Sequence, residues 1–323
     1  MSNKTNSIRN NAIAAREPDV SIIIVNWNLK DYLLRCLESL QQGASGVSTE
    51  TIIIDNASSD GSAEAVRERY PAAKVLQNDT NEGFSRANNQ AMEIARGRYF
   101  FLLNNDTFLY EPALKKLVEF MDAHPEAGIC GPRVLNEDGT LQFRSKGRYP
   151  SIVRALGHFF LPESLQKRSG NRTLGFYDFG ENGKERRMDW VSGCALMVRS
   201  EVVNRIGKLD SDMFMYCEDV DWCFRAARAG WSTYYVPSAR VLHYGGMSMS
   251  RQTGRAVAGH KTGLSGYYGK YHGSAATALF RSILWLGYGV QACGWLAAFL
   301  RGNDRDAGKI KRMLSGLRPG SDK

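Results

Sequence analysis

Short apolar runs alternate with amphipathic stretches along the first 125 or so residues of the chain. The first run, at 20–25 (VSIIIV), is rich in β-branched side chains, as expected of a strand covered on both faces. Similar runs occupy residues 51–54, 74–76 and 99–103. Sequences that favour helices follow at 32–40, 62–70, 85–95 and 111–123, the last with Pro112 in its first turn. This alternation predicts an α/β fold with a doubly wound, mostly parallel sheet.

The alternation weakens after Gly128. Residues 140–190 are rich in Gly, Arg and Lys and have little periodicity, which indicates a variable region that shapes a second substrate site. A regular apolar pattern resumes at 190–199. A helix is predicted over 218–229, ended by Gly230. Two short strands are predicted to follow, at 231–236 and 239–243.

The length fits one large α/β domain with an appendage, or two small domains, and the patterns favour the single domain. Residues 1–19 are polar, lack the apolar core of a secretory signal, and are expected to form a loose tail. The α/β domain is assigned to residues 20–260. A C-terminal helical segment with a basic tail is assigned to residues 261–323.

The formal net charge of +9 suits an anionic ligand, an anionic membrane surface or nucleic acid, and does not choose among them. The basic residues are not gathered on an aromatic platform, which disfavours nucleic-acid binding. None of the six cysteines forms a CxxC pair, so a zinc cluster is disfavoured and a reducing compartment is expected.

Four polar loops rich in Asn and Asp follow the predicted strands, and they occupy residues 26–28, 55–62, 78–84 and 104–106. In parallel sheets, ligands bind beyond the carboxyl ends of the strands. Each loop alone is more simply explained as a turn or a helix cap. Four such loops on one sheet edge favour a ligand site, because their side chains can bind a base, a ribose and a diphosphate with its metal.

Asp106 and the cluster Glu218-Asp219-Val220-Asp221 are the acidic candidates for chemistry. Asp106 follows a strand and can coordinate a hard cation such as Mg²⁺, which often takes only one or two carboxylates together with water and substrate phosphates. The second cluster fits two interpretations equally: acids that favour a helix N-terminus, or a general base. His243, before two glycines, is a weaker candidate.

Several nucleotide-binding classes are disfavoured by the sequence. No GxGxxG follows the first strand, against a nicotinamide dehydrogenase, and no GxxxxGK[ST] is present, against a P-loop NTPase. A nucleotidyltransferase would need a glycine-rich basic loop where Asn26-Trp27-Asn28 stands. A non-catalytic scaffold of a polysaccharide assembly complex remains an alternative, although intact Asp106, Asp219 and His243 argue against it.

Six ordered motifs together resemble the family 2 glycosyltransferases with the GT-A fold, and within them a rhamnosyltransferase-like branch of bacterial surface polysaccharide synthesis. The resemblance spans about residues 20–246, and its motifs read VSIIIVNWN, DNASSDGS, NEGFSRANN, LLNNDT, WVSGCALMVRS and MYCEDVDWCFRAARAGW. Each is weak alone, and the ordered set is specific.

The resemblance implies a role for each matching residue. The donor-binding residues would be Asn26, Asn28, Asp55, Asn56, Asn81, Gly83, Asn88, Asn104 and Asn105, with Asn89 beside them. The metal, Mg²⁺ or Mn²⁺, would be held by Asp106 and His243. Asp219 would be the catalytic base, with Glu218, Trp190 and Gly193 on the acceptor side. Asn104 stands where the family motif DxD has its first acid, which puts two-carboxylate metal binding in doubt.

The implied reaction is inverting and metal-dependent. The best candidate donor is dTDP-L-rhamnose, with a UDP-sugar as the alternative, and the expected acceptor is a glycan, lipid-linked if the C-terminal stretch meets a membrane. The family's processive synthases carry QxxRW, which is missing here, so addition of one or a few sugars is expected.

Residues 282–300 carry no charge and are about as long as a bilayer-spanning helix. Seven Lys or Arg against three Asp follow at 301–323. A single span would separate this basic tail from a catalytic domain that uses cytoplasmic nucleotide sugars. We therefore expect a helix lying in the interface of the inner membrane face, or a re-entrant one, with the tail on anionic lipid. A helix packed on the domain or on a homodimer partner is the alternative.

Overall fold

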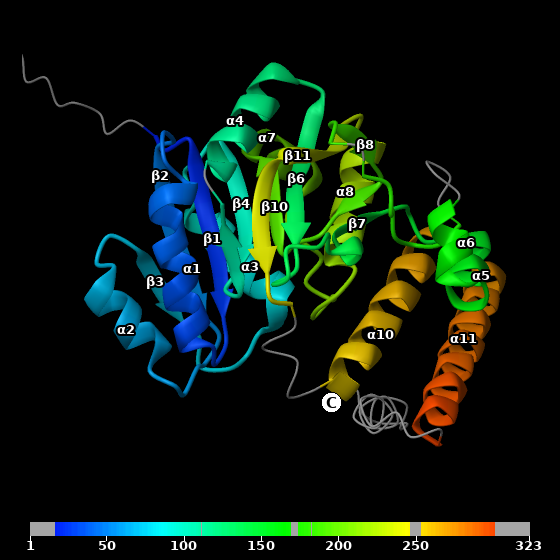
Figure 1. Cartoon of the computed structure of the whole chain (residues 1–323). Helices are drawn as coiled ribbons and strands as arrows, with labels where there is room; N and C mark the ends of the chain where they lie inside the picture. The colour runs from blue at the N-terminus through cyan, green and yellow to red at the C-terminus, as the bar shows by residue number, and fades with distance from the viewer. Residues whose placement is uncertain (1–16, 111, 169–173, 182, 246–252, 301–323) are drawn as a thin grey trace, which may run out of the picture.

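The computed structural model describes residues 17–110, 112–168, 174–181, 183–245 and 253–300 (Figure 1). A nine-stranded sheet runs through the molecule in the order β3-β2-β1-β4-β10-β6-β11-β5, with β8 paired to β11. Its strands are β1 (Val20–Asn26), β2 (Thr49–Asp55), β3 (Lys74–Gln77), β4 (Tyr99–Asn104), β5 (Thr107–Leu109), β6 (Ala127–Leu135), β8 (Arg186–Met188), β10 (Ala195–Arg199) and β11 (Ser232–His243). A short second sheet pairs β7 (Lys146–Gly147) with β9 (Trp190–Val191).

The strand directions match the predicted sheet. β1 is parallel to both β2 and β4, β2 is parallel to β3, and β6 is parallel to β11. Only β10, β5 and β8 run against their neighbours. The sheet is therefore mostly parallel and doubly wound, which confirms the predicted fold class.

Helices cover both faces of the sheet (Figure 1). They are α1 (Lys30–Gly43), α2 (Ser62–Arg69), α3 (Gly83–Ile94), α4 (Ala113–Ala123), α5 (Ile152–Phe160), α6 (Glu163–Arg168), α7 (Ser200–Ile206), α8 (Glu218–Arg228), α10 (Thr253–Tyr271) and α11 (Ser274–Leu300), with a 3₁₀ turn η1 (Phe143–Ser145). Buried side chains of α1 and α4 form one core with Ile22 and Ile24 of β1. Those of α3 and α8 form the other core with Ile23, as the alternation along a strand requires.

Two parts of the chain differ from the sequence prediction. The two short strands predicted at 231–236 and 239–243 form one strand, β11, with an irregular register between Val236 and Arg240. The bulge interrupts the apolar pattern without ending the strand. The region 140–190, which lacks clear periodicity, nevertheless contains η1, β7, α5, α6 and β8.

The parallel strands end at one edge of the sheet. Asn26 at the end of β1 lies opposite Asp55 at the end of β2, and Val25 lies opposite Asn104 at the end of β4. His243 ends β11 and pairs with Thr107 of β5. The polar loops noted in the sequence therefore meet at a common edge.

The C-terminal helices α10 and α11 pack on each other, and α11 crosses α5 (Figure 1). At the crossing, a Cβ on Gly287 would lie 2.2 Å from Cγ of Phe159, so only glycine allows this approach. The predicted domain boundary after residue 260 falls inside α10, and the predicted tails lie outside the described residues except for 17–19. No helix in the described ranges combines the length and the apolar character that crossing a bilayer requires.

Candidate active site

A buried hydrogen-bond network joins the ends of β1, β2 and β4. The Asn26 side-chain amide donates to the Asp55 carboxylate (3.1 Å) and to Ser58 Oγ (3.2 Å), and Asn105 donates to Asn26 Oδ1 (2.7 Å). The Asp55 carboxylate also accepts from the Ser58 N–H (2.9 Å). Asn26, Asp55 and Asn105 are buried, so these predicted donor-binding residues hold the three strand ends in a fixed arrangement.

The loop after β1 is held in a constrained conformation. Asn28 has a φ of 51°, and its Oδ1 accepts from the N–H (2.8 Å) and the hydroxyl (3.2 Å) of Ser59. Ala57, in the facing loop, also has a positive φ, of 62°. Such strained backbone at non-glycine residues gathers at functional sites.

The loop before α3 closes on the loop after β2. The Asn56 amide donates to Asn81 Oδ1 (3.2 Å) and to the Gly83 carbonyl (3.2 Å), while Asn81 Oδ1 accepts the Gly83 N–H (2.9 Å). Gly83 has a φ of +81°, and a Cβ there would lie 2.5 Å from the Phe214 ring. Glycine is therefore required at this position.

Asn88 and Asn89 lie on α3, behind this loop. Asn88 is buried and donates to the Phe84 carbonyl one turn earlier (2.9 Å). Asn89 exchanges hydrogen bonds with the backbone of Leu209, through its amide (2.8 Å) and its Oδ1 (3.0 Å). These two side chains therefore hold the helix and the 207–214 loop in place.

Asp106 and His243 form a close pair at the ends of β4 and β11. His243 Nε2 lies 3.3 Å from Asp106 Oδ1 and 3.4 Å from the Asn104 amide nitrogen. His243 Nδ1 lies 2.7 Å from Oε1 of Gln142, whose amide also donates to the His243 carbonyl (3.1 Å). Burial disfavours the imidazolium, but Cys194 and the Asp106 carboxylate outweigh burial and raise the pKa of His243 to about 10.

A carboxylate beside an imidazole whose other nitrogen is already oriented is a suitable donor set for Mn²⁺ or Mg²⁺. Within the described residues, no group of three or more His, Cys, Asp or Glu is arranged to hold a metal ion. A cation here would therefore take its remaining ligands from water and the donor diphosphate, as Mg²⁺ commonly does. Asn104 lies beside the pair as a neutral neighbour, not as a second acid.

The three acids at the start of α8 have different environments. The Asp219 carboxylate accepts the N–H of Gly193 (3.0 Å) and of Val220 (2.8 Å). Glu218 is buried, and its Oε2 has no hydrogen-bond partner among the residues that the structure describes. Asp221 is buried and bound by Arg225 (2.7 Å), Lys270 (2.9 Å) and the Tyr271 hydroxyl (2.6 Å), so it has a structural role.

Burial raises the pKa of both Glu218 and Asp219, and the negative charge of Asp219 raises that of Glu218 further. Two backbone N–H groups partly offset the effect at Asp219. Glu218 is therefore the member of the pair that retains a proton more readily, which leaves Asp219 as the anionic member.

The predicted acceptor-side residues lie beside Asp219. A Cβ on Gly193 would be 3.4 Å from the Phe84 ring and 3.8 Å from Cβ of Asp219. Trp190 is buried and donates its indole N–H to the Arg148 carbonyl (3.1 Å), with the Tyr177 ring 6.1 Å away. Gly193 thus contacts Asp219 directly, while Trp190 packs with Arg148 and Tyr177.

Three features of the site were not found from the sequence. Gln142 orients His243 from a position 101 residues away. Tyr216 and Cys217 precede α8 with positive φ values of 73° and 70°, and nothing in their residue types predicts this backbone. Gly263 of α10 supports that turn, because a Cβ there would lie 2.4 Å from the Tyr216 carbonyl oxygen.

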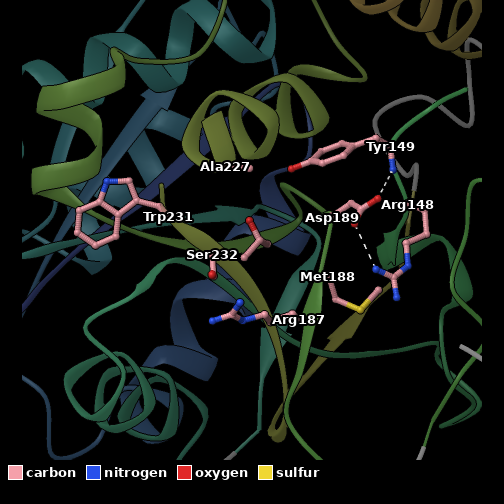
Figure 2. A pocket seen from close by; sticks show the side chains of 9 residues that line it. Arg148, Tyr149, Arg187, Met188, Asp189, Ala227, Trp231 and Ser232 are labelled. Carbon is pink, nitrogen blue, oxygen red and sulfur yellow. Dashed lines mark hydrogen bonds and ion pairs between the residues drawn. The ribbon is translucent and has the colours of Figure 1, made fainter. Parts of the chain in front are cut away.

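A pocket of about 220 Å³ lies at the other edge of the sheet (Figure 2). Its lining includes Ser232, at the start of β11, and Ala227, near the end of α8. Asp189 in its wall is already bound by Arg148 (3.2 Å) and by the Tyr149 N–H (2.8 Å). None of the predicted site residues lines this pocket, so it is separate from the strand-end site.

A mostly parallel sheet with polar residues gathered at its strand ends is the arrangement expected of a GT-A sugar transferase. The model of the family described as Glycosyl transferase family 2 matches residues 21–193, more than half of the chain. The chain belongs to glycosyltransferase family 2, which confirms the family and the enzyme class predicted from the motifs.

Two similar proteins of this family are rhamnosyltransferases. One is the N-acetylglucosaminyl-diphospho-decaprenol L-rhamnosyltransferase of Mycobacterium tuberculosis, 29% identical over 74% of this chain and 80% of that protein. The other is the rhamnosyltransferase WbbL of Escherichia coli K12, 25% identical over 70% of this chain and 83% of that protein. The resemblance to a rhamnosyltransferase-like branch is thereby confirmed.

Solved glycosyltransferases share the fold. The mannosyltransferase PcManGT of Pyrobaculum calidifontis, solved with GDP-Man and Mn²⁺, superposes with a TM-score of 0.54 and 13% identity over 94% of this chain and 86% of that one. GalNAc-T7, solved with UDP, GalNAc and Mn²⁺, gives 0.53 and 17% over 71% of this chain. The chain matches only 44% of the length of GalNAc-T7. At these identities the likeness supports the GT-A fold.

Proposed function

We propose that this enzyme transfers an L-rhamnosyl residue from dTDP-L-rhamnose to a lipid-linked glycan in cell-surface polysaccharide synthesis. The observation that carries the proposal is the similarity to two rhamnosyltransferases over 74% and 70% of the chain. The name of the mycobacterial protein specifies a sugar-diphospho-lipid acceptor. The same fold would accept a UDP-sugar, which is the alternative donor.

Asp219 is the proposed general base for an inverting transfer. Its carboxylate is fixed by the Gly193 and Val220 N–H groups and lies at the edge of the site. Burial raises its pKa, which brings the base closer to neutral pH, where proton abstraction from an acceptor hydroxyl is more effective. The hydroxyl oxygen then attacks the anomeric carbon as the bond to the nucleoside diphosphate breaks.

Asp106 and His243 are the proposed ligands of Mg²⁺ or Mn²⁺, with Gln142 orienting the imidazole. The bound cation would neutralise charge that develops on the leaving diphosphate. The donor nucleotide would lie over Asn26, Asn28, Asp55 and Asn56, with Asn81 and Gly83 at its border. The network among these residues supports the proposal, because it keeps the site preorganised before the donor binds.

We further propose that the enzyme works in the cytoplasm, peripherally bound to the inner face of the membrane. The outer faces of α5 and α11 support this, because they expose large apolar side chains: Val153, Leu156, Phe160, Leu279, Trp285, Leu286 and Val290. The opposite face of α11 is already buried through Phe280, Ile283, Leu284 and Tyr288. A helix that is apolar on both sides is normally covered on both sides. We propose that lipid covers the exposed side of α11, and a homodimer partner is the alternative.

The donor proposal is tested by measuring transfer and thermal stabilisation with a panel of nucleotide sugars, each with Mg²⁺, Mn²⁺ or a chelator. We expect dTDP-L-rhamnose with a divalent cation to give the largest stabilisation, together with transfer to a polyprenyl-diphosphate sugar. A preference for a UDP-sugar would replace the proposed donor. Equal turnover with the chelator would reject the metal-dependent mechanism.

A further inference from the structure

The segment that joins β6 to β7 links His243, the proposed metal ligand, to the backbone that holds Asp219. At one end, Gln142 is bound to His243, the proposed metal ligand (2.7 Å). At the other end, the Ser145 carbonyl accepts the Ser192 N–H (2.9 Å), one residue before the Gly193 N–H that holds Asp219 (3.0 Å). The residues between Gln142 and Ser145 therefore border the space between the Asp106–His243 pair and Asp219.

Arg144 stands in that segment with its charge uncompensated. It is exposed, and within the described parts of the chain it makes no hydrogen bond and no ion pair. Its guanidinium carbon lies 5.8 Å from the centre of the Tyr177 ring. The two residues that follow it, Ser145 and Lys146, are buried and fix the backbone on that side. A rigid backbone thus presents a free guanidinium at the site.

Two tyrosines share this location. Tyr177 packs edge-on against Trp190 on the acceptor side, and Tyr216 packs edge-on against His260 of α10. Burial raises the pKa of both phenols, Asp219 raises that of Tyr177 further, and Glu218 and Asp106 raise that of Tyr216, whereas the charge of Arg144 lowers both. Neither hydroxyl makes a hydrogen bond to another part of the described structure.

We propose that Arg144, with the hydroxyls of Tyr177 and Tyr216, forms a subsite for a phosphate group of the acceptor. A guanidinium presents several donors in a fixed fork that matches phosphate oxygens, and each hydroxyl adds one donor. This inference rests on the proposed function. In a sugar-diphospho-lipid, the diphosphate is attached to the same sugar ring that carries the hydroxyl to be glycosylated. Such a subsite would hold that hydroxyl next to Asp219.

The surroundings also fit a lipid that follows the phosphate. The Tyr177 ring contacts the His158 ring (5.5 Å) on α5, and the adjacent Phe159 contacts Tyr288 (5.0 Å) on α11. These aromatic contacts link the subsite to the two helices that expose the apolar face. A phosphate at Arg144 would therefore have its lipid chain directed toward the proposed membrane surface.

Binding of farnesyl diphosphate, measured by calorimetry on the full chain with saturating dTDP and Mg²⁺, tests the subsite without relying on turnover. Losing a hydrogen-bonded charge contact should weaken binding by about 10–100-fold in Arg144→Gln. Arg144→Lys keeps the charge but loses the planar set of N–H donors, so its affinity for farnesyl diphosphate should lie between those of Arg144→Gln and the unaltered protein. Arg187→Gln, an exposed arginine of the distant pocket, is the matched control and should bind as the unaltered protein does.

Three results would overturn the subsite: unchanged binding in Arg144→Gln, equal binding of farnesol, or binding of farnesyl diphosphate only when dTDP is left out. The last would assign Arg144 to the diphosphate of the donor. A rhamnose-transfer assay distinguishes this inference from the proposed function, because an enzyme that binds farnesyl diphosphate through Arg144 but transfers another sugar refutes only the donor.

Discussion

At the residue scale, Asp219 is the proposed general base, and its substitution tests the proposed mechanism most directly. Asp219→Asn keeps the size and both backbone hydrogen bonds but cannot take a proton, so kcat should fall by about 10²–10⁴-fold. Binding of the nucleotide sugar should change little, because Asp219 lies outside the strand-end network. Steady-state kinetics with calorimetric donor binding measures both quantities.

Glu119→Gln, an exposed carboxylate-to-amide change on α4, is the control and should leave kcat unaltered. Near-normal turnover in Asp219→Asn would remove Asp219 from the mechanism.

The raised pKa of Asp219 also predicts the pH profile. The base is active only when deprotonated, so kcat/KM should fall as the pH drops through this pKa, which burial places above that of an ordinary aspartate. The acid limb should therefore appear at a higher pH than 3.8, the value of an unperturbed aspartate. An acid limb that persists unchanged in the residual activity of Asp219→Asn would belong to a different group.

Gln142 gives a residue-scale test of the metal site. Its Oε1 accepts from His243 Nδ1, which leaves Nε2 for a cation. Gln142→Leu removes this orientation and should raise the Mn²⁺ concentration for half-maximal activity by about 10–100-fold. Titration of activity with Mn²⁺ measures the shift. His243→Ala should shift it further, and an unaltered midpoint in both variants would place the metal elsewhere.

At the element scale, α10 packs against the turn at Tyr216 and Cys217, which leads into Asp219, the proposed base. Gly263 leaves no room for a side chain against the Tyr216 backbone, whereas Gly266, almost one turn later, meets nothing within 4 Å. Gly263→Ala should displace the turn and lower kcat by up to about 100-fold if the base moves by 1 Å. Gly266→Ala should keep activity and raise stability by about 0.5–1 kcal/mol. Equal kinetics in the two variants would show that α10 does not position Asp219.

The elements that could be predicted from the sequence are those fixed by local pattern. The β-branched runs that form β1 and β2 and the polar residues at their ends were identified because burial and turn chemistry act over a few residues. The partnership of Gln142 with His243 could not be predicted, since it joins residues 101 apart through the fold. The left-handed turn at Tyr216 depends on the packing of α10, which no local pattern encodes.

At the scale of the whole molecule, the fold separates two surfaces with different tasks. The strand-end site lies where β1, β2 and β4 terminate, and the apolar face lies on α5 and α11. Aromatic contacts through His158 and Phe159 connect the two. An acceptor with a polar head and a lipid tail could engage both surfaces at once, which a water-soluble glycan would not require.

The apolar face carries the last prediction. A variant with Trp285→Ser, Leu286→Ser and Val290→Ser removes three exposed side chains from the outer side of α11. Each is expected to contribute about 1.5 kcal/mol or more when lipid covers it, so partition onto anionic vesicles should weaken by at least about tenfold. Cosedimentation with phosphatidylglycerol vesicles measures this. Tyr110→Ser, which removes an exposed aromatic side chain elsewhere, should bind as the unaltered protein does. If the triple variant instead converts a dimer into a monomer and keeps its vesicle binding, a second copy of the chain covers this face.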